Sequence, residues 1–149
     1  MSFIGKVGYL GLNFVRAAQN AESALETAIR DVKKAIPHAH LERAEPDLLN
    51  LSELGFLFDF SKQNMRKYAR GEIASVTEEF PSPVITGKAS YWHAAEIAQW
   101  LKEQGVRKIA DKEIEMLFTI WSLNQANELL HQPNPEMTQT FTRLLQSVA

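Results

Sequence analysis

Six polar side chains between residues 62 and 70 are of the types that bind DNA. They are Lys62, Gln63, Asn64, Arg66, Lys67 and Arg70. Gln and Asn can each form two hydrogen bonds with an adenine edge, Arg can do so with guanine, and Lys or Arg can neutralise phosphate. On a helix capped by Ser61, these six side chains would point outward while Met65, Tyr68 and Ala69 point inward. The pattern predicts a helix that contacts DNA.

The preceding residues predict a second helix and a sharp turn. Asn50 can cap a helix, and Glu53, three residues later, completes a capping box. The apolar face of this helix would be formed by Leu54, Leu57 and Phe58. Asp59 follows where the chain must turn, because Asp adopts the left-handed conformation more readily than most residues. Residues 50–70 therefore predict a helix-turn-helix, a motif whose second helix enters the major groove of DNA.

A polar helix face can also be merely solvated, and the charge of the chain tests this alternative. The formal net charge is −2, whereas DNA-binding domains are usually basic. The positive charge is concentrated, however. Residues 61–70 carry four basic and no acidic side chains, whereas residues 1–60 carry six basic and eight acidic ones. A local positive patch on an otherwise acidic chain favours a site-specific binder over a general DNA coat protein.

Downstream of this motif the sequence predicts a hairpin and a further helix. Two short apolar runs flank Thr86 to Ala89, so residues 84–92 predict a β-hairpin that would act as a wing. Lys88 and Ser90 lie in this hairpin, and Lys88 is a candidate phosphate contact, although lysines are common at hairpin tips. The helix from His93 to Lys102 would end at Gly105 and bury Ile97, Trp100 and Leu101.

The N-terminal part, residues 1–47, predicts a βαβ-like unit. Residues 6–15 contain β-branched and aromatic residues in loose alternation, which indicates a strand. Asn20 caps a strongly amphipathic helix that Pro37 stops, and residues 38–44 suggest a second short strand. Such a unit is too small to bury its own sheet face, so it needs a partner. Its unpaired sheet edge is one candidate dimer interface.

The C-terminal part, residues 106–149, predicts a helical hairpin. Asp111 can cap a helix over residues 111–131, and Asn134 with Pro135 begins another over residues 135–147. The apolar side chains of these helices exceed what a winged motif needs, so we expect them to form a dimer interface. The predicted interface residues are Leu117, Phe118, Trp121, Phe141, Leu144 and Leu145. We favour this interface over the N-terminal edge.

The expected fold is thus mainly α with small β elements, an α+β chain in three parts. Residues 1–47 are the βαβ-like unit, residues 48–105 the winged helix-turn-helix, and residues 106–149 the dimerising hairpin. Without cysteine, disulfides and Cys-ligated zinc or iron–sulfur clusters are excluded. His38 and His40 have no Cys or third His nearby, and Glu42 is the only adjacent carboxylate, so we expect no metal and no cofactor.

Other function classes find little support in the sequence. It contains no Gly-Lys-Ser/Thr phosphate loop, GxSxG elbow or HExxH helix, so an enzyme is not expected. His93 stands beside Trp92 at a helix start, where packing is the better interpretation than catalysis. No run approaches the ~20 apolar residues of a membrane span and no export leader is evident, which predicts a cytoplasmic protein.

Two stretches resemble bacterial MerR-like, excisionase-like and AlpA-like winged helix-turn-helix proteins. They are ELGFLFDFSKQNMRKY, from Glu53 to Tyr68, and FPSPVITGKASYWHAAEIAQWL, from Phe80 to Leu101. The resemblance implies a recognition helix containing Ser61, Lys62, Gln63, Asn64, Arg66 and Lys67. It also implies a wing containing Lys88 and Ser90. It does not reach residues 1–45 or 106–149.

The chain departs from the family pattern at three positions in this motif. Gly55 stands where a small Ala is usual, Asp59 where Gly is usual, and Phe56 where a polar residue is expected. An apolar residue at position 56 hints that another segment covers the first helix.

The resemblance and the residues together leave three functions open. The first is a sequence-specific transcriptional regulator, expected to be a repressor that binds an inverted repeat of double-stranded DNA as a homodimer. The second is an excisionase-like accessory factor for a recombinase. The third is an antitoxin-type or adaptor module whose partner is a protein such as a toxin. The segments outside the winged motif argue against a minimal excisionase.

Overall fold

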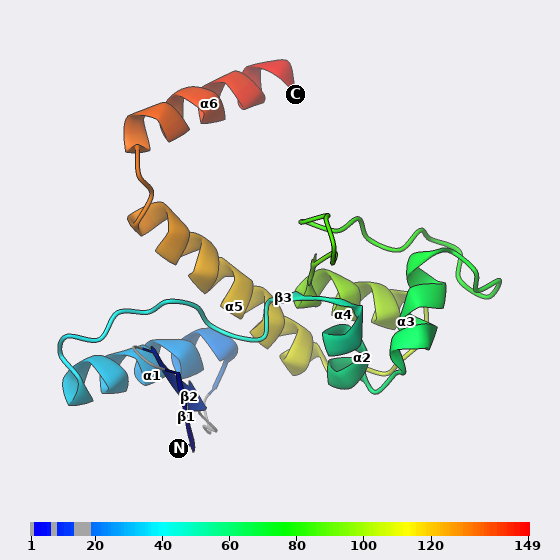
Figure 1. Ribbon diagram of the computed structural model, residues 1–149, viewed down its shortest axis with the longest axis horizontal. Coiled ribbons are helices and arrows are strands. Elements are labelled where there is room, and N and C mark those ends of the chain that lie inside the picture. Colours follow the sequence, from blue (N-terminus) through cyan, green and yellow to red (C-terminus); the bar gives the residue numbers. More distant parts are fainter. Residues whose placement is uncertain (1, 7–8, 14–18) are drawn as a thin grey trace.

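The computed structural model describes residues 2–6, 9–13 and 19–149, and it is mainly helical with two small antiparallel sheets (Figure 1). The helices are α1 (Ala21–Ala35), α2 (Leu51–Phe58), α3 (Lys62–Ala69), α4 (Ala94–Glu103), α5 (Asp111–Leu130) and α6 (Pro135–Val148). The strands are β1 (Ser2–Lys6), β2 (Tyr9–Asn13), β3 (Leu48–Leu49) and β4 (Trp92–His93). The expected class, mainly α with small β elements, is confirmed at this level.

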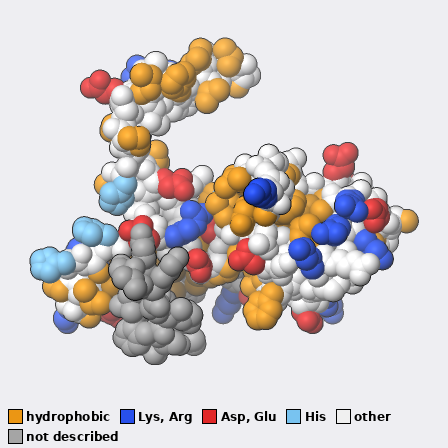
Figure 2. All heavy atoms as spheres, viewed as in Figure 1, with side chains coloured by type: hydrophobic (Ala, Val, Ile, Leu, Met, Phe, Trp, Pro, Cys, Tyr) orange, Lys and Arg blue, Asp and Glu red, His pale blue; other side chains and the backbone are white. Residues whose placement is uncertain are grey.

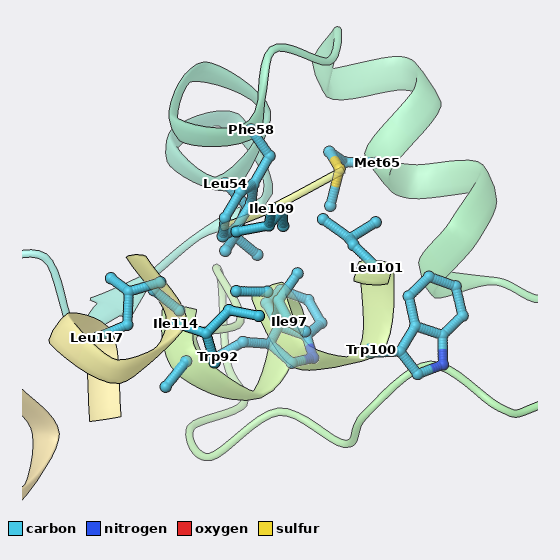
Figure 3. Close-up of a cluster of buried hydrophobic side chains, with 13 residues drawn as sticks. Leu54, Phe58, Met65, Trp92, Ile97, Trp100, Leu101, Ile109, Ile114 and Leu117 are labelled. Carbon is cyan, nitrogen blue, oxygen red and sulfur yellow. The ribbon is translucent and has the colours of Figure 1, made fainter. Parts of the chain in front are cut away.

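The hydrophobic core lies between α2, α3, α4 and the first half of α5 (Figure 3). Its largest fully buried side chains are Leu54, Met65, Ile97 and Leu101. Trp100 is buried, as the sequence predicts, and so is Trp92. The core does not stop at residue 105, because it also includes Ile109, Ile114 and Leu117. The first turns of α5 therefore complete the core of residues 48–105.

Helices α2 and α3 begin and end through local interactions that the sequence predicts. The Asn50 side chain accepts a hydrogen bond from the Glu53 amide at 2.9 Å, and Glu53 accepts one from the Asn50 amide at 3.1 Å. Asp59 ends α2 in the left-handed conformation, with φ of 60°. Ser61 caps α3 by accepting a hydrogen bond from the Asn64 amide. Both caps and the turn residue are thus confirmed.

The turn between α2 and α3 depends on Gly55. The Phe60 amide donates to the Gly55 carbonyl at 2.7 Å, which brings the returning chain directly onto α2. A Cβ atom at position 55 would lie 2.5 Å from the Phe60 carbonyl oxygen. Real Cβ atoms essentially never approach backbone that closely. The close approach of Phe60 therefore accounts for glycine at position 55.

We expect Gly55→Ala to destabilise the protein, although alanine normally stabilises a helix relative to glycine. Relieving the clash requires a backbone shift at Phe60, which should lower the free energy of unfolding by roughly 1–3 kcal/mol. Urea denaturation followed by circular dichroism measures the change. Gly87→Ala is the matched control, since its nearest neighbour atom would lie at 3.9 Å. An unchanged or higher stability of Gly55→Ala would contradict this account of the turn.

The hairpin predicted at residues 84–92 is short. It is closed by hydrogen bonds from the Val84 amide to the Tyr91 carbonyl at 2.8 Å and from the Tyr91 amide to the Ile85 carbonyl at 3.0 Å. Its second arm continues into β4, which pairs with β3 so that Leu49 lies opposite Trp92. The Trp92 indole also donates to the Pro81 carbonyl at 2.8 Å. These contacts fix the base of the hairpin against the core.

The N-terminal βαβ-like prediction is wrong. Strands β1 and β2 pair with each other as an antiparallel hairpin, with Ser2 opposite Asn13 and Lys6 opposite Tyr9. Part of the strand expected over residues 6–15 lies outside the described residues. The helix capped by Asn20 is confirmed, with the Asn20 side chain accepting from the Ser23 amide at 2.8 Å. The N-terminal order is thus two strands and then a helix.

Residues 38–44 form no strand because side chains of α5 satisfy their backbone. The Asn127 side-chain amide donates a hydrogen bond to the Leu41 carbonyl at 2.9 Å. Asn124 both accepts from the Ala44 amide at 2.8 Å and donates to the Ala44 carbonyl at 2.9 Å. These two asparagines supply the hydrogen bonds that a neighbouring strand would otherwise supply. The segment therefore runs along α5 as extended chain without a sheet.

A buried carboxylate joins this segment to α4 and α5. Asp47, whose side chain is 2% exposed, accepts hydrogen bonds from Arg43 at 2.7 Å and from Asn124 at 2.8 Å. Its other oxygen lies 2.6 Å from Nδ1 of His93. The His93 ring stacks on Trp121 with centroids 3.8 Å apart. The cluster fixes α5 against the start of α4, and it shows His93 as a packing residue.

The C-terminal helices differ from the predicted hairpin in three respects. Ala110, not Asp111, occupies the N-cap position of α5 and makes no side-chain cap. Leu117 is buried in the core, and Trp121 is half-buried with its ring stacked on His93. Helix α6 begins at Asn134 and Pro135 as predicted, but none of its residues is buried. It extends away from the body of the molecule instead of packing along α5 (Figure 1).

Candidate nucleic-acid interface

Helix α3 presents the polar face that its sequence predicts. Each of the seven predicted contact residues on this element is exposed: Ser61, Lys62, Gln63, Asn64, Arg66, Lys67 and Arg70. The opposite face is anchored by Met65, which is fully buried, and by the half-buried Tyr68. The Tyr68 ring meets Phe60 and Trp100 edge-on, with centroids 5.8 and 5.9 Å apart. The helix is therefore held from one side only, and its polar side faces solvent.

The side chains on this face form few interactions within the described part of the chain. Within the described part of the chain, the side chains of Lys62, Gln63, Arg66 and Lys67 form no hydrogen bond or ion pair. Arg70 lies 3.9 Å from Glu72, a long and exposed pair that contributes little. Figure 2 shows blue basic side chains gathered on the part of the surface where Figure 1 places α3. Such side chains can form new hydrogen bonds without first breaking internal ones.

Arg107 holds the turn in front of this helix, a role that the sequence did not predict. Its guanidinium donates to the Asp59 carbonyl at 2.7 Å and lies 4.2 Å from the centre of the Phe60 ring. It thus binds the turn through both a charge-assisted hydrogen bond and a cation–π contact. Arg107 is 48 residues from Asp59 along the chain, so no local pattern could reveal the contact.

The hairpin at residues 84–92 carries the other predicted contacts. Lys88 is exposed and Ser90 is half-buried. The hairpin leads through β4 into the N-terminal end of α4, whereas α3 packs on Trp100 near the other end of α4. Helix α4 has ten residues and is therefore about 15 Å long. The two predicted contact regions are thus attached near opposite ends of α4.

No three His, Asp or Glu side chains within the described part of the chain are grouped as metal ligands. No described helix is long and apolar enough to cross a membrane. His38 and His40 are both exposed.

Comparison of the chain with protein-family models, curated proteins and solved structures found no significant match.

Proposed function

We propose that this protein is a sequence-specific DNA-binding transcriptional regulator of the winged helix-turn-helix type. The observation that carries the proposal is the exposed face of α3, which holds Lys, Gln, Asn and Arg without a carboxylate and with one long ion pair, from Arg70 to Glu72, in the described chain. In this proposal α3 lies in the major groove, where Gln63, Asn64 and Arg66 contact base edges. The function is regulatory, and neither a catalytic step nor a cofactor is part of it.

The hairpin fits the proposal as a wing. Lys88 in its turn would contact a phosphate of the duplex that α3 enters. Gly55, Asp59 and Arg107 support the proposal indirectly, because they hold α3 at a defined angle to the core. A fixed angle matters, since base contacts need side chains placed to within a fraction of an ångström.

We further propose a cytoplasmic repressor that binds an inverted repeat as a homodimer. One recognition helix covers few base pairs, and a two-fold dimer places two of them about 34–36 Å apart, one turn along the duplex. Of the predicted interface residues, Phe118, Phe141, Leu144 and Leu145 are exposed and available to a partner.

A second candidate, an adaptor or antitoxin-type module, is favoured by one patch. Phe56 on α2 is 91% exposed, so no described segment covers it. Together with Pro46, Leu49 and Leu57 it lines a shallow apolar hollow on the side of α2. Large exposed apolar side chains grouped in this way often mark protein-binding sites. A toxin or a recombinase bound there would not exclude DNA binding by α3.

Selection from random double-stranded DNA tests the main proposal. The purified protein should enrich fragments that share a motif, and that motif should be an inverted repeat with half-sites about 10 base pairs apart. Fragments enriched without any shared motif would show non-specific phosphate binding and overturn sequence-specific recognition. No enrichment at all would favour the protein-interaction candidate.

Salt dependence tests the phosphate contacts separately. A Lys67→Ala, Arg70→Ala, Lys88→Ala variant should bind all sequences more weakly, and the slope of log affinity against log salt should fall by about one unit per contact. Fluorescence anisotropy at several salt concentrations measures this slope.

The matched control for the salt experiment removes three lysines from other helices: Lys33, Lys34 and Lys112. Lys33 and Lys34 lie at the end of α1, and Lys112 in the first turn of α5. This control changes the net charge equally. If both triple variants flatten the slope to the same extent, a local phosphate contact is contradicted.

A further inference from the structure

Helix α6 carries an apolar stripe that nothing in the described chain covers. Its members are Met137, Phe141, Leu144, Leu145 and Val148, which are between 50% and 70% exposed. Figure 2 shows this stripe as a continuous orange band along the projecting helix. A helix of 14 residues is marginal by itself, since isolated helices below about 12–15 residues hardly form in water. The stripe therefore needs a partner if α6 is to persist.

The spacing of the stripe is that of a coiled-coil seam. Met137, Phe141, Leu144 and Val148 are separated by four, three and four residues, which is the alternation of heptad core positions over slightly less than two heptads. Leu145 extends the seam on one side. The other flanking positions are Thr138, Thr140 and Ser147, which carry no charge. The two charged residues of the helix, Glu136 and Arg143, lie off the seam. No charge at the seam thus repels an identical helix.

We infer that α6 pairs in antiparallel orientation with α6 of a second copy of this chain. The inference deepens the proposed dimer by naming its interface, and it does not depend on DNA binding. A two-fold axis between residues 142 and 143 places Met137 against Val148 of the partner and Phe141 against Leu144 of the partner. Each layer then joins one longer and one shorter side chain, so the seam is filled evenly.

The parallel alternative packs less evenly. It would place Phe141 against Phe141 and Val148 against Val148, so layers with two large side chains would alternate with layers with two smaller ones. It would also align the two helix dipoles and bring both molecular bodies to the same end of the pair. The antiparallel pair avoids both effects, because each four-residue connection from α5 then enters from an opposite end.

The chain's own groove between α1 and α5 is a poorer site for this helix. The groove has a volume of about 710 Å³ and is lined by Leu25, Ile29 and Phe118, but Glu22, Glu26 and Glu115 border it. Helix α6 offers one cation, Arg143, which lies off the apolar stripe. Charge complementarity is therefore lacking, whereas the α6 pair needs none.

Light scattering after size exclusion, without DNA, tests the pairing. The natural chain should be a dimer at micromolar concentration. Leu144→Asp places a charge in two layers and should raise the dissociation constant at least about 100-fold, giving a monomer. Gln146→Asp adds the same charge off the seam and should leave the dimer intact. The thermal midpoint of monomeric Leu144→Asp reports on the core, which α6 does not enter. A monomeric natural chain, or a dimeric Leu144→Asp, overturns the inference.

Cross-linking tests the orientation, since the natural chain has no cysteine. In the antiparallel pair Thr140 flanks Ser147 of the partner, whereas in a parallel pair Thr140 flanks Leu145. A mixture of Thr140→Cys and Ser147→Cys proteins, one of them tagged, should give mixed dimers with a short bismaleimide. Preferential linking of Thr140→Cys with Leu145→Cys would overturn the antiparallel arrangement. Because both tests omit DNA, their failure leaves the DNA-binding proposal standing, and failed DNA selection leaves the pairing standing.

Discussion

We expect a quadruple alanine variant of α3 to bind its selected DNA site at least about 1,000-fold more weakly than the natural chain. The four residues replaced are Lys62, Gln63, Asn64 and Arg66. The losses of binding free energy should add up, because each good base contact is worth roughly 1–3 kcal/mol of discrimination. The fold should be unaffected, since all four side chains are exposed. Anisotropy titrations at one fixed salt concentration measure the affinity, and thermal unfolding measures the stability.

The control for this variant removes two lysines and two amides from other exposed helix positions: Lys33, Lys34, Gln125 and Gln139. Its affinity should stay within a few-fold of the natural chain, because these residues lie on α1, α5 and α6. If the α3 variant keeps its affinity for the selected site, the assignment of α3 as the recognition helix is wrong.

Asp47→Ala is expected to cause the largest loss of stability of any single substitution considered for this chain. The substitution removes the common acceptor of His93, Asn124 and Arg43, and it leaves Nδ1 of the largely buried His93 ring without its partner. The expected fall in the free energy of unfolding is roughly 2–5 kcal/mol. Chemical denaturation at neutral pH measures it. Asp47→Asn, which keeps the shape and one acceptor, should lose less.

Asp111→Ala is the matched control for the buried carboxylate. Asp111 also pairs with a cation, Lys102, but its side chain is 86% exposed. Exposed pairs contribute little, so the change should stay within about 1 kcal/mol. Equal effects of the two alanine substitutions would show that the buried cluster does not stabilise the fold beyond an ordinary surface pair.

The features that the sequence predicts best depend on interactions between residues at most four positions apart. The caps of α1, α2, α3 and α6 each join a side chain to an amide three positions away. Asp59 at the turn is likewise a local choice, made by the conformational preference of one residue. The exposed face of α3 follows from helical periodicity alone, because a short helix against one core has only one buried side.

The features that the sequence does not predict are held by partners far away along the chain. Asn124 takes the place of a strand for Ala44, 80 residues earlier, so the alternation in residues 38–44 is misleading. Asp47 meets Asn124 across 77 residues and His93 across 46. The exposure of α6 could not be predicted for a different reason, because α6 has no partner within the described chain. An apolar stripe signals that a partner is needed, but it does not say whether that partner is the same molecule.

The contribution of α5 to the core has a consequence for how the protein forms during synthesis. Helices α2, α3 and α4 leave the ribosome before α5, so their apolar faces are exposed until Ile109, Ile114 and Leu117 have been made. At about 5–20 residues per second, the chain spends some seconds with this surface uncovered. Asn124, which closes the cluster around Asp47, emerges later still. We therefore expect the nascent chain to bind holdase chaperones until α5 has emerged, and to release them as the turn of α5 bearing Asn124 reaches Asp47.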